Sequence, residues 1–150
     1  MQKAVSKILL VDTDPAHAAT AHKILALSVV EITHLTSGEQ GLGYLFGNAA
    51  KPALPDLIIL HLGLSHHFVV EILEKMRTEK ATEKIPVLIL PDSIDEKQLL
   101  ERFAFKLCSC AVKPLTFGKL VYALPSLGMA VNESILYTKS ESNGTSLAYR

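Results

Sequence analysis

Short apolar runs alternate with segments of helical periodicity along most of the chain. Ile8–Val11, Leu57–Leu60 and Val87–Leu90 are continuously apolar, which is typical of strands that are covered on both faces. The segments Val29–His34 and Leu107–Val112 are mixed but carry β-branched residues or small apolar residues, and they predict the second and the last strand. The pattern as a whole therefore predicts five strands.

A helix signal follows each predicted strand. Asp14–Pro15 supplies an N-cap and a proline for the first helical position, while Ser37–Gln40 and Ser93–Glu96 resemble capping boxes. Side chains spaced three or four residues apart mark the buried helix faces: His17, Ala21, Ile24 and Leu25 in the first helix, Val69, Ile72, Leu73 and Met76 in the third, and Phe117, Leu120, Val121 and Leu124 in the last. Strands and helices in alternation predict a doubly wound α/β domain with a parallel sheet.

The composition divides the chain into three segments. Residues 1–5 form a short N-terminal arm, residues 6–127 the α/β domain, and residues 128–150 a tail rich in Ser, Asn, Thr and Lys. Such a tail buries little apolar surface, so we expect it to be disordered. The first apolar run stops after four residues at Asp12, which is too short for a membrane span or a signal peptide. We therefore expect a cytoplasmic protein that makes no membrane contact.

Charge and motif content exclude several function classes. Fifteen basic residues balance fifteen acidic ones, which does not favour a nucleic-acid partner. Cys108 and Cys110 are one residue apart, unlike zinc ligands or a useful disulfide, and indicate small core thiols in a reducing compartment. The glycines match neither a dinucleotide-binding motif nor a phosphate-binding loop. The sequence thus predicts no cofactor.

Four stretches of sequence carry a resemblance to a known family. KILLVDTDP, PDLIILHLGLS, IPVLILPDS and AVKPL resemble, in order and spacing, the receiver domains of bacterial two-component response regulators, over about residues 6–127. The resemblance is strongest to the stand-alone receivers that serve phytochrome-type histidine kinases. It implies the CheY-like, flavodoxin-like (βα)5 fold with five parallel strands in the order 2-1-3-4-5.

The same resemblance implies a phosphorylation chemistry. In this family an aspartate at the end of the third strand accepts a phosphoryl group from a phosphohistidine. Acidic residues after the first strand hold Mg²⁺, a hydroxyl residue follows the fourth strand, and a lysine precedes a proline at a cis peptide bond.

The phosphoacceptor and metal positions depart from this pattern. His61 stands at the acceptor position, and an imidazole is a poor Mg²⁺ ligand that cannot form an acyl phosphate. Asp12 keeps the first acidic position, but Thr13 replaces the second. Asp14 is also acidic, yet as an N-cap it is expected to face its own helix. We therefore expect no metal to be held here.

The remaining pocket positions are also altered, with one exception. Pro91 replaces the hydroxyl residue after the fourth strand, and Asp92 follows it where the family prefers a small side chain. Cys110 occupies the position of the aromatic residue that reports phosphorylation. Only Lys113–Pro114 is kept. Because an unpaired ammonium ion would be costly to bury, we expect Lys113 to pair with Asp12 or Asp92.

These substitutions together predict a pseudo-receiver that is not an enzyme and that acts by binding, independently of phosphate. The expected partner is a sensor histidine kinase, another signalling protein or a second copy of the chain. The resemblance implies a binding surface over Ser93–Phe103, Leu107–Val112 and Phe117–Leu124, with Phe105 or Tyr122 as candidate anchors.

Two alternatives stay open at this point. The chain could be a phosphoreceiver that uses a substitute acceptor, namely Asp12, Asp14 or Asp92. It could instead be a metal-responsive binding module centred on His61, with His66 or His67 as a further imidazole ligand. A third idea, that His61 itself relays a phosphoryl group, is disfavoured because relay histidines lie exposed on helices.

Overall fold

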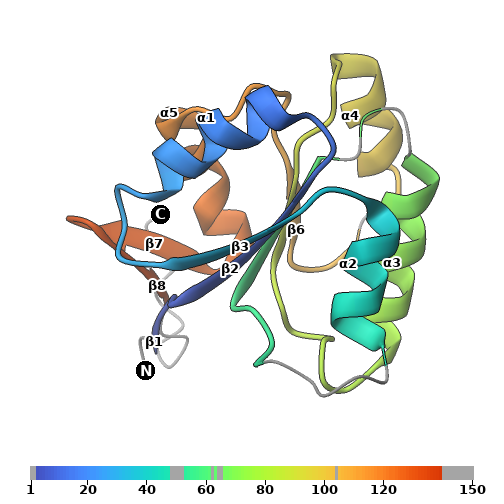
Figure 1. Ribbon diagram of the computed structural model, residues 1–150, viewed down its shortest axis with the longest axis horizontal. Helices are drawn as coiled ribbons and strands as arrows, with labels where there is room; N and C mark the ends of the chain where they lie inside the picture. The colour runs from blue at the N-terminus through green and yellow to red at the C-terminus, as the bar shows by residue number, and fades with distance from the viewer. Residues whose placement is uncertain (1–2, 48–52, 62, 64–65, 104, 140–150) are drawn as a thin grey trace.

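A five-stranded parallel sheet forms the centre of the molecule (Figure 1). The computed structural model describes residues 3–47, 53–61, 63, 66–103 and 105–139. The strands are β2 (Lys7–Asp12), β3 (Glu31–Leu35), β4 (Leu57–His61), β5 (Val87–Ile89) and β6 (Cys108–Cys110). They lie in the order β3-β2-β4-β5-β6. Counted along this sheet alone the order is 2-1-3-4-5, so the predicted CheY-like topology is confirmed.

Helices cover both faces of this sheet (Figure 1). The contacts of the buried side chains place α1 (Pro15–Leu25) and α5 (Phe117–Ala123) on one face. The other face carries α2 (Gly38–Phe46), α3 (His66–Thr78) and α4 (Ile94–Glu101). Side chains from Asp14, Ser37, Ser93 and Thr116 accept backbone N–H bonds at the first turns of α1, α2, α4 and α5. The helix starts that were expected from capping residues are thereby confirmed.

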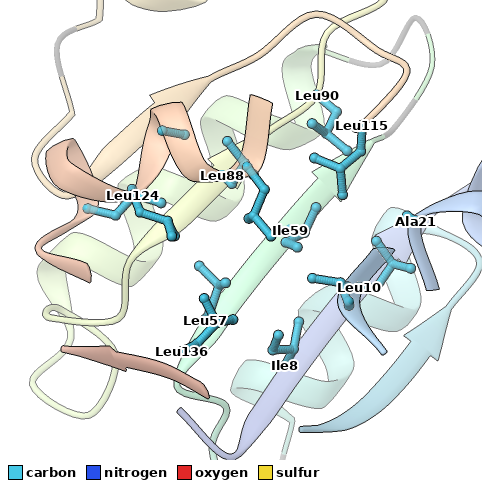
Figure 2. Close-up of a cluster of buried hydrophobic side chains, with 14 of the residues drawn as sticks. Ile8, Leu10, Ala21, Leu57, Ile59, Leu88, Leu90, Leu115, Leu124 and Leu136 are labelled. Atoms are coloured by element: carbon cyan, nitrogen blue, oxygen red, sulfur yellow. The ribbon is translucent and has the colours of Figure 1, made fainter. Parts of the chain in front are cut away.

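The apolar runs of the three inner strands serve two cores at once. Successive side chains of a strand point to opposite faces, so Leu10 and Ile59 join the core beneath α1 and α5 (Figure 2). Leu9 and Ile58 join the core beneath α2 and α3 instead. All four are fully buried. This double burial explains why these strands are apolar at every position instead of at every second one.

Both ends of the described chain depart from the prediction. The segments expected to be an arm and a disordered tail contain β1 (Lys3–Ala4), β7 (Met129–Asn132) and β8 (Ile135–Thr138), which form a three-stranded antiparallel sheet in the order β1-β8-β7. A 3-10 turn, η1 (Leu124–Leu127), links α5 to this sheet. The prediction of disorder from residue 128 was therefore wrong for this hairpin. Residues 140–150 lie outside the described part.

The hairpin is ordered because it extends the core beneath α1 and α5. Met129 and Leu136 are fully buried in that core, which offsets the chain entropy that the polar composition suggested would dominate. Gly128 precedes the hairpin at φ 70°, a conformation that favours glycine. Glu133 adopts φ 60° in the tight turn, where no glycine signals a hairpin. In the described part of the chain, no helix is long and apolar enough to cross a membrane.

Candidate functional site

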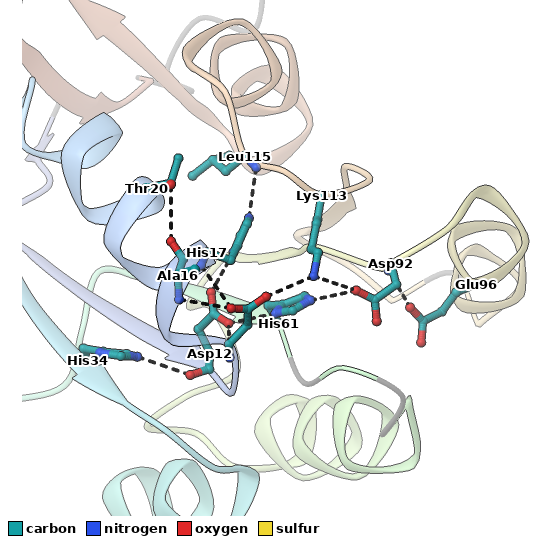
Figure 3. A network of polar contacts seen from close by, with 11 residues as sticks. Asp12, Ala16, His17, Thr20, His34, His61, Asp92, Glu96, Lys113 and Leu115 are labelled. Carbon is teal, nitrogen blue, oxygen red and sulfur yellow. Dashed lines mark hydrogen bonds and ion pairs between the residues drawn. The ribbon is translucent and has the colours of Figure 1, made fainter.

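A cluster of polar side chains lies where the strands of the parallel sheet end (Figure 3). Asp12 and His61 are the last residues of β2 and β4 and are direct partners in the register of these two strands. Asp92 follows β5, and Lys113 follows β6. The carboxyl edge is where open α/β sheets place their sites. We refer to Asp12, Asp14, His17, His61, Asp92 and Lys113 as the Asp12 cluster.

His61 bridges two carboxylates. Its Nδ1 lies 2.8 Å from Oδ1 of Asp12 and its Nε2 lies 3.0 Å from Oδ1 of Asp92. An ionised carboxylate only accepts hydrogen bonds, so each ring nitrogen must donate a proton. His61 is therefore an imidazolium ion, although its side chain is only 2% exposed.

The pKa values of the three groups agree with this assignment. Burial opposes the charged form of His61, but the hydrogen bonds to Asp12 and Asp92 outweigh it and raise the pKa of His61 above its ordinary 6.5. Burial likewise opposes ionisation of Asp12 and Asp92. The hydrogen bonds from His61 reverse this, together with those from His17 and Lys113, and the pKa of each carboxyl lies below its usual value.

Lys113 closes the cluster on its solvent side. Its Nζ lies 3.3 Å from Oδ2 of Asp14 and 3.3 Å from Oδ1 of Asp92. The expected pairing with Asp92 is present, whereas the one with Asp12 is not, because two histidines already occupy the oxygens of Asp12. Asp14 does cap its own helix through Oδ1, and it also offers Oδ2 to Lys113. The Lys113–Pro114 peptide bond is cis, as the resemblance implied.

Two predicted pocket positions contribute through the backbone. The amide of Thr13 donates to the carbonyl of His61 at 3.2 Å, and the amide of Lys113 donates to the carbonyl of Pro91 at 2.9 Å. Thr13 is exposed and Pro91 is buried. The side chains of both residues are thus outside the ion-pair arrangement, which depends on Asp12, Asp14, Asp92, His61 and Lys113.

The sequence reasoning missed one member of the cluster. His17 was assigned to the apolar face of the first helix, and it is indeed buried, but its Nδ1 lies 2.7 Å from Oδ2 of Asp12. The amide of Leu115 donates to Nε2 of His17 at 3.1 Å. Nε2 therefore carries no proton, and the proton of this neutral ring sits on Nδ1. The sequence did carry a signal for this contact. His17 is a polar ring on the apolar face of a helix, and it follows a strand that ends in Asp by about one helical turn.

Three buried side chains of the cluster carry atoms that could bind a metal ion. Asp12, His17 and His61 bring one ligand atom each within 4.8 Å of one another. A metal on Nδ1 of His17 would leave the ring proton on Nε2, where it would face the N–H of Leu115. His61 would also have to lose its proton and a carboxylate bond. For Mg²⁺, which requires oxygen ligands, the buried triad supplies a single carboxylate that two imidazole rings already bind. These residues do not fit a metal ion.

Other predicted residues lie away from the cluster. His67 is exposed on α3 and lines a shallow groove with Leu99 and Phe103 of the fourth-helix region. The side chain of His66 is outside the described part. Burial raises the pKa of Cys110 to about 12, so this residue is an unreactive thiol that packs against the core beneath α3. The expectation of a small core thiol is met.

The two candidate anchors differ in exposure. Tyr122 on α5 is 89% exposed. Phe105 is half-buried and stacks on Phe103, with ring centroids 5.8 Å apart. Tyr122 is thus available to a partner, whereas Phe105 mainly supports its exposed neighbour Phe103.

The sheet order and the cluster at its carboxyl edge define a CheY-like α/β domain. Solved structures with this fold include the bacteriophytochrome response regulator RtBRR (28% identity, TM-score 0.69, 87% of this chain and 84% of that chain covered). They also include the phosphorylated cyanobacterial phytochrome response regulator RcpA (27%, 0.61, 78% and 86%) and a putative response regulator from Chloroflexus aurantiacus (25%, 0.63, 79% and 93%). No family profile matches the chain, and no curated protein does.

These likenesses cover most of the chain and show that it is similar to the receiver domains of response regulators. The predicted resemblance, including the relation to receivers of phytochrome systems, is thereby confirmed.

Proposed function

We propose that this receiver domain signals by protein–protein interaction without accepting a phosphoryl group. The observation that carries the proposal is the bridge that His61 makes between Asp12 and Asp92. A carboxylate nucleophile would have to occupy the position of His61, and a cation would have to enter the space that the imidazolium fills. The bridge supports a pocket that is closed to both reactants.

The charge balance of the cluster supports the same proposal. Three carboxylates, from Asp12, Asp14 and Asp92, face two fixed cations, His61 and Lys113. The cluster therefore retains one net negative charge without any added metal ion. In a phosphorylatable pocket the cation comes from solution, whereas here an imidazole on β4 supplies the central positive charge. The pocket is held in one arrangement by the protein itself.

The proposed partner is a sensor histidine kinase, another regulator or a second copy of this chain. The surface that the family resemblance implies, over α4, β6 and α5, carries several exposed apolar side chains: Ile94, Leu99, Phe103, Phe117, Val121 and Tyr122. Exposed apolar and aromatic residues favour a protein interface. In this proposal the domain has no enzymatic activity of its own.

Incubation with Mg²⁺ and acetyl phosphate, followed by intact-mass measurement, tests the proposal. We expect no mass change for the parent chain. The matched control is the double variant His61→Asp, Thr13→Asp, which restores the acceptor and the second acidic position and is expected to gain one phosphoryl group. A phosphoryl group on the parent would overturn the proposal and would favour a substitute acceptor among Asp12, Asp14 and Asp92. Peptide mapping would then identify which of them reacted.

A further inference from the structure

His17 joins the Asp12 cluster to the loop that leads into α5 (Figure 3). Its side chain is 4% exposed and extends from α1, between the end of β2 and the segment that follows β6. One ring nitrogen binds Oδ2 of Asp12 at 2.7 Å, and the other accepts the amide proton of Leu115 at 3.1 Å. The contact to Leu115 joins residues that are 98 positions apart in the sequence. His17 is thus a direct side-chain link from the cluster to this loop.

The two hydrogen bonds of His17 depend on each other. A neutral imidazole carries one proton, so when one nitrogen donates, the other can only accept. If Asp12 stops accepting from Nδ1, the buried donor is left without a partner, which is costly. Moving the proton to Nε2 would relieve that loss, but the N–H of the ring would then face the N–H of Leu115, with no acceptor between them. A change at Asp12 therefore changes the bond at Leu115 as well.

The loop that receives this link controls the start of α5. Leu115 is buried, and the next residue, Thr116, caps α5 through its hydroxyl group, which accepts from the amide of Lys119. The exposed side chains of α5, Val121 and Tyr122 among them, belong to the proposed partner surface. Asp12 also receives His61 on its other oxygen, Oδ1. One carboxylate is thereby shared between the bridge and the link.

We propose that His17 makes the position of α5 depend on the Asp12 carboxylate, through the hydrogen bond to the Leu115 amide. This inference rests on the proposed function, because it names how the binding surface is regulated from the same pocket. His17 acts as a positioning residue. An event that turns or neutralises the Asp12 carboxylate releases the Leu115 amide and shifts α5. While the His61 bridge is intact, the amide is held.

The direct test is NMR on the complete chain. The scalar coupling between the Leu115 amide nitrogen and Nε2 of His17 reports the N–H···N bond, and the ring nitrogen shifts report which nitrogen is protonated. We expect a measurable coupling and a protonated Nδ1 in the parent chain, and loss of at least half of the coupling in the Asp12→Asn variant. A ring protonated on Nε2, or a coupling that Asp12→Asn leaves unchanged, would overturn the proposal.

Two matched variants separate the halves of the link. Asparagine at position 17 places its amide near the site of Nδ1 and keeps the contact to Asp12, whereas glutamine reaches the site of Nε2 and keeps the contact to Leu115. In the parent background, Asp12→Asn is expected to shift the amide resonances of Leu115 and α5. In His17→Asn and in His17→Gln these shifts should fall by at least half, while those at the end of β4 persist.

The outcomes also separate this inference from the proposed function. Shifts of α5 that persist at full size in both His17 variants would refute the link, but they would leave the mass measurement on the parent chain unaffected. A phosphoryl group on the parent chain would refute the proposed function, whereas the coupling to Leu115 would still be observed in the chain before phosphorylation. If either His17 variant fails to fold, the ring protonation and the coupling in the parent and in Asp12→Asn decide the matter alone.

Discussion

Replacing His61 with leucine tests the charge assignment on which the pocket depends. The change replaces the imidazolium ion with an apolar side chain of comparable size. It leaves the carboxylate of Asp12 fully buried with hydrogen bonds only from His17 and the Asp14 amide. Removing one partner of a buried ion pair typically costs about 3–5 kcal/mol. Because two hydrogen bonds to Asp12 remain, we expect the lower end, a loss of about 3 kcal/mol in the free energy of unfolding.

Urea denaturation at a series of pH values measures this loss. The folded-state pKa of His61 is raised above 6.5, so the stability that its proton contributes is fully present below pH 6.5. It is lost as pH rises through the folded-state pKa. The carboxyls of Asp12 and Asp92 have lowered pKa values, so their contribution is present above about pH 3.8 and is lost as pH falls further. The difference between parent and variant should therefore be largest between about pH 4 and pH 6.5.

His34→Leu is the matched control for His61→Leu. His34 donates from Nε2 to the backbone carbonyl of Asp12 at 3.2 Å and is exposed, so His34→Leu should cost only about 1 kcal/mol. A His61→Leu variant as stable as the parent at pH 6 would show that His61 is neutral and weakly bound. A stability difference between parent and variant that grows above pH 8 would contradict the predicted pH dependence.

Four further outcomes follow from the structure. Lys113→Ala should lower stability by about 1 kcal/mol in the same denaturation assay, since its ion pairs are partly solvated; an unchanged midpoint would show that these pairs contribute nothing. Leu136→Ala should lower the free energy of unfolding by about 2–5 kcal/mol because the side chain is fully buried, whereas Ile135→Ala at an exposed position should lower it little. Equal losses in the two variants would contradict the burial described for the hairpin. If copies of the chain associate through α5, Tyr122→Glu should reduce the mass measured by light scattering to that of one chain, and an unaltered dimer would exclude this face. Zinc titrated into the parent should give no heat of binding, and micromolar affinity would contradict the protonation assigned to His17.

The sequence determined the order of the elements and the membership of most of the cluster. Continuous apolar runs required strands covered on both faces, and capping residues set the starts of α1, α2 and α4. The family resemblance placed Asp12, His61, Asp92 and Lys113 in one pocket. The physical reason is that the carboxyl ends of parallel strands meet at one edge of the sheet, and each of these residues lies at or shortly after the end of a strand.

Only the tertiary structure decided the protonation of the pocket and the fate of the chain ends. His61 is charged because the carboxylate of Asp92, 31 residues away in the sequence, accepts from its second ring nitrogen. His17 is neutral because its Nε2 accepts from the amide of Leu115, 98 residues away. Such contacts depend on side-chain directions across packed elements, which sequence spacing does not encode. The hairpin was missed for the same reason. Its strands are short and mostly apolar but stand next to polar residues, and they are held by burial of Met129 and Leu136 against a core built by distant segments.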